Sequence, residues 1–197
     1  MILKRLLLFI LFLNIGLFIW MDLEQRKFEV NYTQETASMP QVGFQAPNFS
    51  LIELGREEES ETTDSTDSAV YVDLPTILSE KEGAVIYFWT SWCPFCEASV
   101  RALEEGHLIY GDELAFVGIN VTSQDSLRAA QTFVKEHNVS FQMIADETGI
   151  VASTYHVPPV PATFFINQDG VIAHRKVGGL TTREVELGIS VLKRSGE

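Results

Sequence analysis

Cysteine and positive charge are what this sequence has least of. Its 197 residues include two cysteines, and 14 lysines and arginines stand against 27 aspartates and glutamates, giving a formal net charge of −13. This acidity argues against nucleic acid as a partner, because phosphate binding needs a basic face. It also disfavours docking onto anionic lipid, so we interpret the acidic surface as a solubilising one.

The two cysteines, Cys93 and Cys96, do not fit a structural role. A disulfide stabilises a fold by closing a loop, and a bridge across so short a loop constrains almost nothing. A structural zinc site usually needs four ligands in tetrahedral geometry. This chain has no second cysteine pair to complete such a set, and its four histidines show no His-x3–5-His spacing. The spacing therefore predicts a redox-active dithiol, and no metal is expected.

The pair lies at a predicted strand-to-helix turn, in the run 87–96, YFWTSWCPFC. Pro94 suits the first position of a helix, where no backbone N–H is needed. Cys93 is therefore expected near the helix N-cap, where the free N–H groups of the first turn favour a thiolate. Cys96 is expected one turn inside and more buried. We infer that Cys93 attacks and that Cys96 resolves the mixed disulfide.

Glu97 limits the expected activation of the pair, because one anion disfavours a second anion nearby. The dipeptide between the cysteines, Pro94-Phe95, carries no cation. We therefore expect a moderately activated thiol rather than a strongly oxidising one.

The N-terminal segment 1–21 is predicted to be a retained transmembrane anchor. Lys4 and Arg5 precede an apolar run of nearly the length of about 20 residues that a spanning helix needs. A cleaved signal peptide is the alternative, but such peptides end in small residues, whereas this run ends in Phe-Ile-Trp-Met at 18–21. The basic end is expected to stay in the cytoplasm, which places the rest of the chain outside.

Composition divides the remainder into a linker and one domain. Residues 22–40 are polar and are expected to form a juxtamembrane linker, and residues 41–197 are expected to form an α/β domain. Within that domain, residues 56–68 contain no apolar side chain and are predicted to be an exposed acidic loop. A calcium site in this loop is the alternative, although no EF-hand pattern is present.

Hydrophobic patterning predicts the elements of the domain. Continuous apolar runs predict buried strands at 84–89 and 114–121. The Asp-Gly turn at 169–170 predicts a hairpin of strands 162–167 and 171–177. The other predicted elements are a short strand or β-hairpin arm within 41–54, strands at 70–72 and 142–145, and helices at 74–81, 94–108, 123–137, 147–155 and 181–193. This order implies parallel strands joined by right-handed crossovers, and hence a mixed central sheet with helices on both faces.

A second motif, Val160-Pro161-Ala162-Thr163, directly precedes the hairpin, and its X–Pro bond can be cis at small cost. With the dithiol run and this strand order, the chain resembles the thioredoxin superfamily over residues 40–194. The N-terminal anchor, the arm Ala46-Pro47-Asn48-Phe49 and the insert before the proline loop resemble its membrane-anchored extracytoplasmic branch, the ResA/TlpA type.

This resemblance implies a thioredoxin-like fold and a set of site residues. Cys93 would be the nucleophile and Cys96 the resolving thiol, and Pro161 would be a cis-proline facing them. Trp92 would lie beside the dithiol as a platform for substrate. The backbone of Val160 could pair with an extended substrate in strand fashion. The cysteine pair would be the redox centre, with no further cofactor.

Two positions depart from the family pattern. Many thioredoxins carry a buried Asp on the strand before the dithiol, where this chain has Tyr87. Some ResA-type reductases carry a Glu three residues after the second cysteine, where this chain has Ser99. Glu97, which adjoins Cys96, is then the candidate for the group that accepts the proton of Cys96.

The leading hypothesis is a membrane-tethered thiol–disulfide oxidoreductase that acts on cysteines of extracytoplasmic proteins. By family analogy it would be a reductant, for example of apocytochrome c before haem attachment, and a membrane protein would supply its electrons. An oxidant or isomerase for secreted proteins is an alternative, because the sequence does not fix the direction of electron flow.

Two other classes fit less well. The fragment Thr90-x-x-Cys93 is typical of peroxiredoxins, but the proline expected four residues before the threonine is Ile86 here. A copper-delivery protein of the Sco type would space its cysteines three residues apart and add a histidine ligand.

Overall fold

A computed structural model of the chain describes residues 17, 40–54, 71–157 and 159–196. All of these residues except Leu17 belong to the second of two compact units, which spans 39–197.

Three predicted segments lie outside the described residues. They are the anchor at 1–21, the linker at 22–40 and the acidic loop at 56–68, apart from the single residues Leu17 and Pro40. Within the described ranges, no helix is long and apolar enough to cross a membrane.

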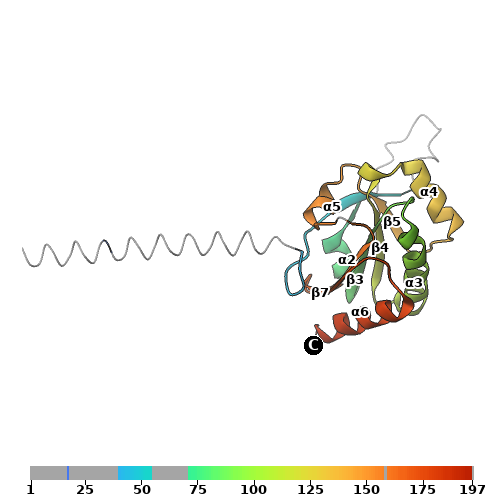
Figure 1. Cartoon of the computed structure of the whole chain (residues 1–197). Helices are drawn as coiled ribbons and strands as arrows, with labels where there is room; N and C mark the ends of the chain where they lie inside the picture. The colour runs from blue at the N-terminus through green and yellow to red at the C-terminus, as the bar shows by residue number, and fades with distance from the viewer. Residues whose placement is uncertain (1–16, 18–39, 55–70, 158, 197) are drawn as a thin grey trace, which may run out of the picture. The chain divides into compact units, whose positions relative to one another are not determined.

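One seven-stranded sheet forms the centre of the described domain, in the order β2-β1-β5-β4-β3-β6-β7 (Figure 1). The strands are β1 (Ser50–Glu53), β2 (Tyr71–Asp73), β3 (Gly83–Trp89), β4 (Ala115–Asn120), β5 (Gln142–Ala145), β6 (Ala162–Asn167) and β7 (Ile172–Val177). Strands β3, β4 and β5 run parallel, whereas β1, β2, β6 and β7 add antiparallel pairs at the two sides. The predicted mixed sheet is confirmed.

Helices cover both faces of the sheet (Figure 1). They are α2 (Leu74–Glu80), α3 (Pro94–Tyr110), α4 (Leu127–Glu136), α5 (Ile150–Thr154) and α6 (Thr182–Arg194). Because side chains alternate along a strand, β3 contributes side chains to two hydrophobic cores, one on each face of the sheet. Tyr87 and Trp89 pack with α3, α4 and α6, and Ile86 and Phe88 pack with α2 and α5. Burial of β3 on both faces explains its continuous apolar run.

The N-terminal arm contains a strand, as predicted, and this strand joins the central sheet. Strand β1 pairs antiparallel with both β2 and β5. Before it, the arm runs beside the other side of the sheet, where the N–H of Gly43 donates to the carbonyl of Ile172 at 2.9 Å. The arm therefore contacts β7 at one side of the sheet and, through β1, β5 towards the other side.

The largest difference from the predicted elements lies before α4. The helix expected from Ser123 begins at Leu127, because Ser126 is its N-cap and accepts from the N–H of Ala129 at 3.2 Å. Residues Thr122–Gln124 form a separate 3-10 turn, η1. Asp125, between η1 and α4, has an extended backbone, and its side chain accepts hydrogen bonds from Ser91 and Asn120.

Candidate active site

The dithiol occupies the turn between β3 and α3. Cys93 is the N-cap of α3, with Pro94 at the first helical position, as predicted. The N–H of Cys96 donates to the carbonyl of Cys93 at 3.0 Å, which closes the first turn. The Cys93 thiol itself makes no capping hydrogen bond, so its sulfur is available to other partners.

The two thiols are unpaired and differ in exposure. Cys96 is fully buried, whereas Cys93 keeps 5% of its surface exposed. The Cys93 sulfur lies 3.9 Å from the carbonyl oxygen of Val160, and the peptide bond between Val160 and Pro161 is cis. The predicted cis bond beside the dithiol is therefore confirmed.

The surroundings of Cys96 disfavour its thiolate. Burial raises the pKa of Cys96 to about 12, and the adjacent Cys93 thiol adds to this rise. The backbone of Thr90 and the hydroxyl of Tyr87 oppose the rise, because both stabilise negative charge on the sulfur. Cys96 is therefore protonated at neutral pH.

Trp92 and Phe95 are the large apolar side chains exposed beside the dithiol, at 60% and 68%. The indole N–H of Trp92 donates to the carbonyl of Gln124 at 2.8 Å, which orients the ring. Exposed aromatic surface next to a reactive thiol is suited to contact another protein chain.

The loop after β4 holds the dithiol turn through Asp125. This carboxylate accepts from the N–H of Ser91 at 2.6 Å and from the amide of Asn120 at 2.9 Å. Burial by itself raises the pKa of Asp125, but hydrogen bonds from Ser91, Asn120 and the Ser126 N–H outweigh it and lower the pKa below its usual value. Sequence reasoning missed this residue, because nothing local distinguishes it from a solvent-facing aspartate.

Residues 42–175, which include the dithiol and the cis-proline loop, match the model of the AhpC/TSA family. The chain belongs to this family. It is 32% identical over 149 residues to the thioredoxin-like protein YneN of Bacillus subtilis, covering 74% of this chain and 77% of that protein. It is 30% identical over 158 residues to the thiol-disulfide oxidoreductase ResA of Halalkalibacterium halodurans, covering 79% and 80%.

A solved structure gives the same result. The secreted disulfide oxidoreductase of Mycobacterium tuberculosis, described as homologous to E. coli DsbE, aligns with a TM-score of 0.58 at 26% identity, covering 73% of this chain and 96% of that chain. The resemblance found in the sequence is thereby confirmed. This AhpC/TSA family member is a thiol–disulfide oxidoreductase with a thioredoxin-like fold.

Glu97 does not lie where its predicted role needs it. Its carboxylate pairs with Arg101 one turn along α3, and both side chains are largely exposed. Cys96 faces the buried side of the same helix. This arrangement gives no support to the hypothesis that Glu97 accepts the proton of Cys96.

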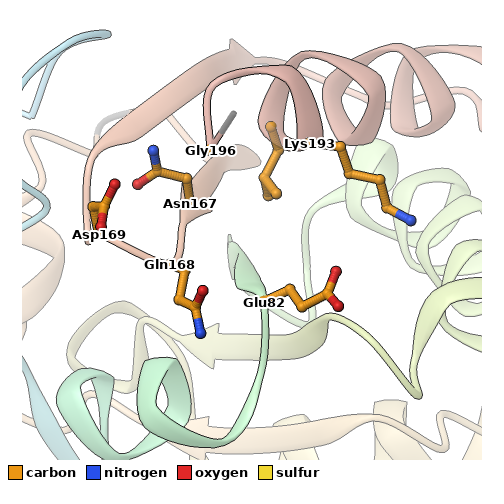
Figure 2. Close-up of a pocket in the computed structure, with 7 residues that line it drawn as sticks. Glu82, Asn167, Gln168, Asp169, Lys193 and Gly196 are labelled. Atoms are coloured by element: carbon orange, nitrogen blue, oxygen red, sulfur yellow. The ribbon is translucent and has the colours of Figure 1, made fainter.

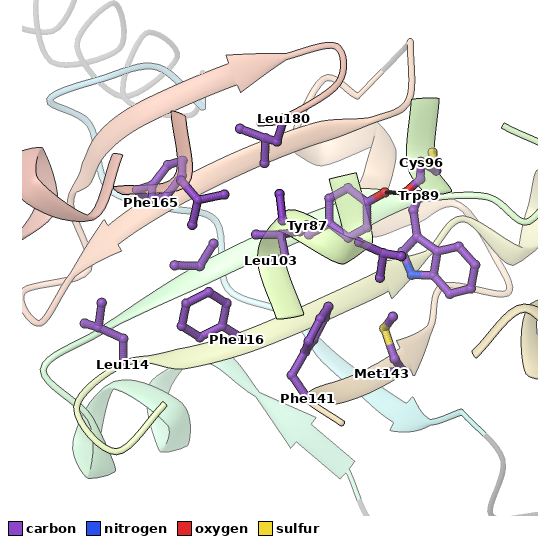
Figure 3. Close-up of a cluster of buried hydrophobic side chains, with 14 of the residues drawn as sticks. Tyr87, Trp89, Cys96, Leu103, Leu114, Phe116, Phe141, Met143, Phe165 and Leu180 are labelled. Atoms are coloured by element: carbon purple, nitrogen blue, oxygen red, sulfur yellow. Dashed lines mark hydrogen bonds between the residues drawn. The ribbon is translucent and has the colours of Figure 1, made fainter. Parts of the chain in front are cut away.

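Ser99 and Tyr87, the two positions that depart from the family pattern, do lie beside Cys96. Ser99 is buried; its hydroxyl donates to the Phe95 carbonyl at 2.8 Å and accepts from the N–H of Leu180 at 3.0 Å. The hydroxyl of Tyr87 donates to the carbonyl of Cys96 at 3.1 Å (Figure 3).

A pocket of about 380 Å³ lies at the opposite end of the sheet (Figure 2). Glu82 lines it just before β3 begins, and Asn167 lines it where β6 ends, whereas Cys93 follows the far end of β3. The pocket contains neither cysteine, so it is separate from the redox chemistry.

The chemistry available at the dithiol is a two-electron exchange. Two adjacent thiols can close into a disulfide while they reduce a disulfide elsewhere. Among the described residues, no three His, Cys, Asp or Glu side chains gather as ligands for a metal ion.

Proposed function

We propose that this oxidoreductase is tethered to the membrane by residues 1–21 and reduces disulfides of proteins outside the cytoplasm. Cys93 is its attacking thiol and Cys96 its resolving thiol. The difference between the two cysteines is the observation that supports the proposal. Cys93 keeps some exposure beside the Val160 carbonyl, whereas Cys96 is fully buried and its pKa is raised. Apocytochrome c before haem attachment is a candidate substrate, and a membrane protein returns the electrons.

The reaction runs in two exchanges. The Cys93 thiolate attacks one sulfur of the substrate disulfide, and the other substrate sulfur leaves and takes up a proton. Cys96 then loses its proton and attacks the Cys93 sulfur. The bond from Cys93 to substrate breaks, the substrate leaves as a dithiol, and the enzyme keeps the Cys93–Cys96 disulfide until the membrane donor reduces it.

Substrate recognition is assigned to the surface around Cys93. An extended substrate segment pairs with the backbone of Val160 in strand fashion, and Pro161 adds no competing donor or nucleophile. The exposed ring of Trp92 supplies an apolar platform on the other side. Pro94 supports the site by beginning α3 directly after Cys93.

An extracytoplasmic position is supported by the basic residues before the apolar N-terminal run and by the relative in M. tuberculosis, which is a secreted protein. The intact mass of the protein extracted from membranes tests the tether. We expect the full chain, with residues 1–21 retained. A mass without these residues would remove the anchor from the proposal.

The direction of electron flow is tested by the redox state of the pair in growing cells. Cells are quenched in acid, free thiols are tagged with a maleimide, and the tagged fraction is read from the mass. A reductant is held mainly as the dithiol, so we expect two tags on most molecules. A chain found mainly as the disulfide would make it an oxidant.

The chemistry is tested by the reduction of insulin disulfides in the presence of dithiothreitol. We expect turnover by the wild-type chain and none by Cys93→Ser. Consumption of hydrogen peroxide without insulin turnover would favour the peroxidase, and tight Cu(I) binding without turnover would favour copper delivery.

A further inference from the structure

Tyr87 reaches Cys96 from the central strand of the sheet. Its side chain is 1% exposed and points from β3 into the core beneath α3 (Figure 3). Its hydroxyl donates to the Cys96 carbonyl at 3.1 Å. The side chains of Cys96 and Ser99 both act on the pKa of this phenol, and the phenol in turn lowers the pKa of Cys96. The phenol and the buried thiol therefore share one small polar cluster within an otherwise apolar core.

The hydroxyl of Tyr87 is free to rotate, so that its hydrogen bond goes to the Cys96 sulfur instead of the carbonyl. A carbonyl in the first turn of an α-helix is the acceptor for the N–H four residues later, so the Cys96 carbonyl does not depend on Tyr87 for a partner. When the phenol turns to the sulfur, no buried acceptor is left unsatisfied. The same donor can thus serve the carbonyl in one state and the sulfur in another.

The phenol can donate to a thiolate, but it cannot take the proton away. Burial raises the pKa of Tyr87 well above its usual value, and Cys96 beside it adds to the rise. The hydroxyl is therefore protonated whenever Cys96 reacts. A buried carboxylate at this position would instead accept the proton of the thiol. A tyrosine and a carboxylate therefore give the resolving step different pH dependences.

We propose that Tyr87 is a catalytic residue of the resolving step, in which its hydroxyl donates a hydrogen bond to the Cys96 thiolate as that sulfur attacks the mixed disulfide at Cys93. The proton lost by Cys96 goes to solvent and the departing substrate sulfur takes one up, so Tyr87 ends the step unchanged. The inference rests on the proposed role of Cys96 as the resolving thiol.

The two exchanges can be followed separately with 5,5′-dithiobis(2-nitrobenzoate). The reduced full-length chain is mixed with an excess of this reagent in a stopped-flow instrument. A first release of nitrothiobenzoate reports attack by Cys93, and its rate depends on reagent concentration. A second, concentration-independent release reports attack by Cys96. The Cys96→Ser variant should show the first phase alone.

Tyr87→Phe should slow the second phase by about tenfold or more, which is the loss expected for one hydrogen bond to a buried anion. The first phase should stay within about twofold of wild type. Tyr155→Phe is the matched control, because Tyr155 is equally buried and its hydroxyl donates to the Pro47 carbonyl at 2.6 Å in the other core. That variant should lose stability without slowing the second phase.

A second measurement needs no variant at Tyr87. In the wild-type chain, the rate of the second phase should rise about tenfold per pH unit between about pH 6 and 9 without levelling, because, among the described residues, the groups that shift the pKa of Cys96 include no carboxylate. A plateau in that range, a Tyr87→Phe variant that resolves at the wild-type rate, or equal slowing by Tyr155→Phe would overturn the proposal.

Failure of the proposed function gives a different result in the same experiment. If Cys93 is not the attacking thiol, Cys93→Ser keeps the first phase, whatever happens at Tyr87. If the roles of the cysteines are right and Tyr87 is not involved, the wild-type chain, Tyr87→Phe and Tyr155→Phe share one second-phase rate.

Discussion

The carboxylate of Asp125 accepts two hydrogen bonds from Ser91, one from its N–H and one from its hydroxyl, each at 2.6 Å. Ser91 lies two residues before Cys93, and Asp125 lies in the loop between η1 and α4. The adjacent carbonyl of Gln124 accepts from the indole of Trp92. One short loop thus fixes both the backbone of the dithiol turn and the exposed aromatic ring beside it.

Asp125→Asn is expected to destabilise the domain by about 2 kcal/mol at neutral pH, since hydrogen bonds to a charged acceptor are lost or weakened. The pKa of Asp125 is lowered in the folded state. Its contribution is therefore complete above the unfolded value of about 3.9 and is lost as pH falls through the folded value. Urea unfolding of both proteins tests this: the difference should shrink towards pH 2. A constant difference would contradict it.

Trp92→Ala should reduce turnover of insulin disulfides by about tenfold, because a large exposed aromatic contributes strongly to binding another chain. Reaction of the same variant with the small reagent 5,5′-dithiobis(2-nitrobenzoate) should be nearly unchanged. Leu108→Ala is the matched control, since Leu108 is also exposed on the domain surface, at the far end of α3. Equal losses in both variants, or in both assays, would count against a substrate platform at Trp92.

Alkylation by iodoacetamide should distinguish the two thiols. In Cys93→Ser, Cys96 should react slowly at pH 7, and its rate should keep rising up to about pH 9, because burial raises the pKa of this thiol to about 12. In Cys96→Ser, Cys93 should react faster at every pH in that range. Faster labelling of Cys96 than of Cys93 would reverse the assigned roles.

The sequence was sufficient where structure is set locally. Strands β5 and β6 have the predicted bounds, and α3 begins at the predicted residue, because apolar runs, prolines and the Asp-Gly turn carry these boundaries in the chain itself. The dithiol and its position at the N-cap followed from the same kind of signal. The cis bond before Pro161 was implied by the resemblance to the thioredoxin superfamily.

What the sequence could not supply depends on contacts between distant segments. The pairing of β1 with β5 and the bonds from Ser91 to Asp125 join residues that no local pattern connects. The helix α4 begins later than predicted because Ser126, rather than Ser123, is its N-cap. Glu97 was favoured by its closeness in the chain to Cys96, but on the helix it turns towards Arg101.

Trapping in cells tests the central claim, that Cys93 attacks disulfides of extracytoplasmic proteins, most directly. The full-length Cys96→Ser variant cannot resolve its mixed disulfides, so acid quenching and non-reducing electrophoresis should show adducts that dithiothreitol releases. We expect the released proteins to be extracytoplasmic and to contain cysteine, and we expect no adducts from the Cys93→Ser/Cys96→Ser double variant. An absence of adducts from Cys96→Ser, or adducts of equal abundance from Cys93→Ser, would contradict the account.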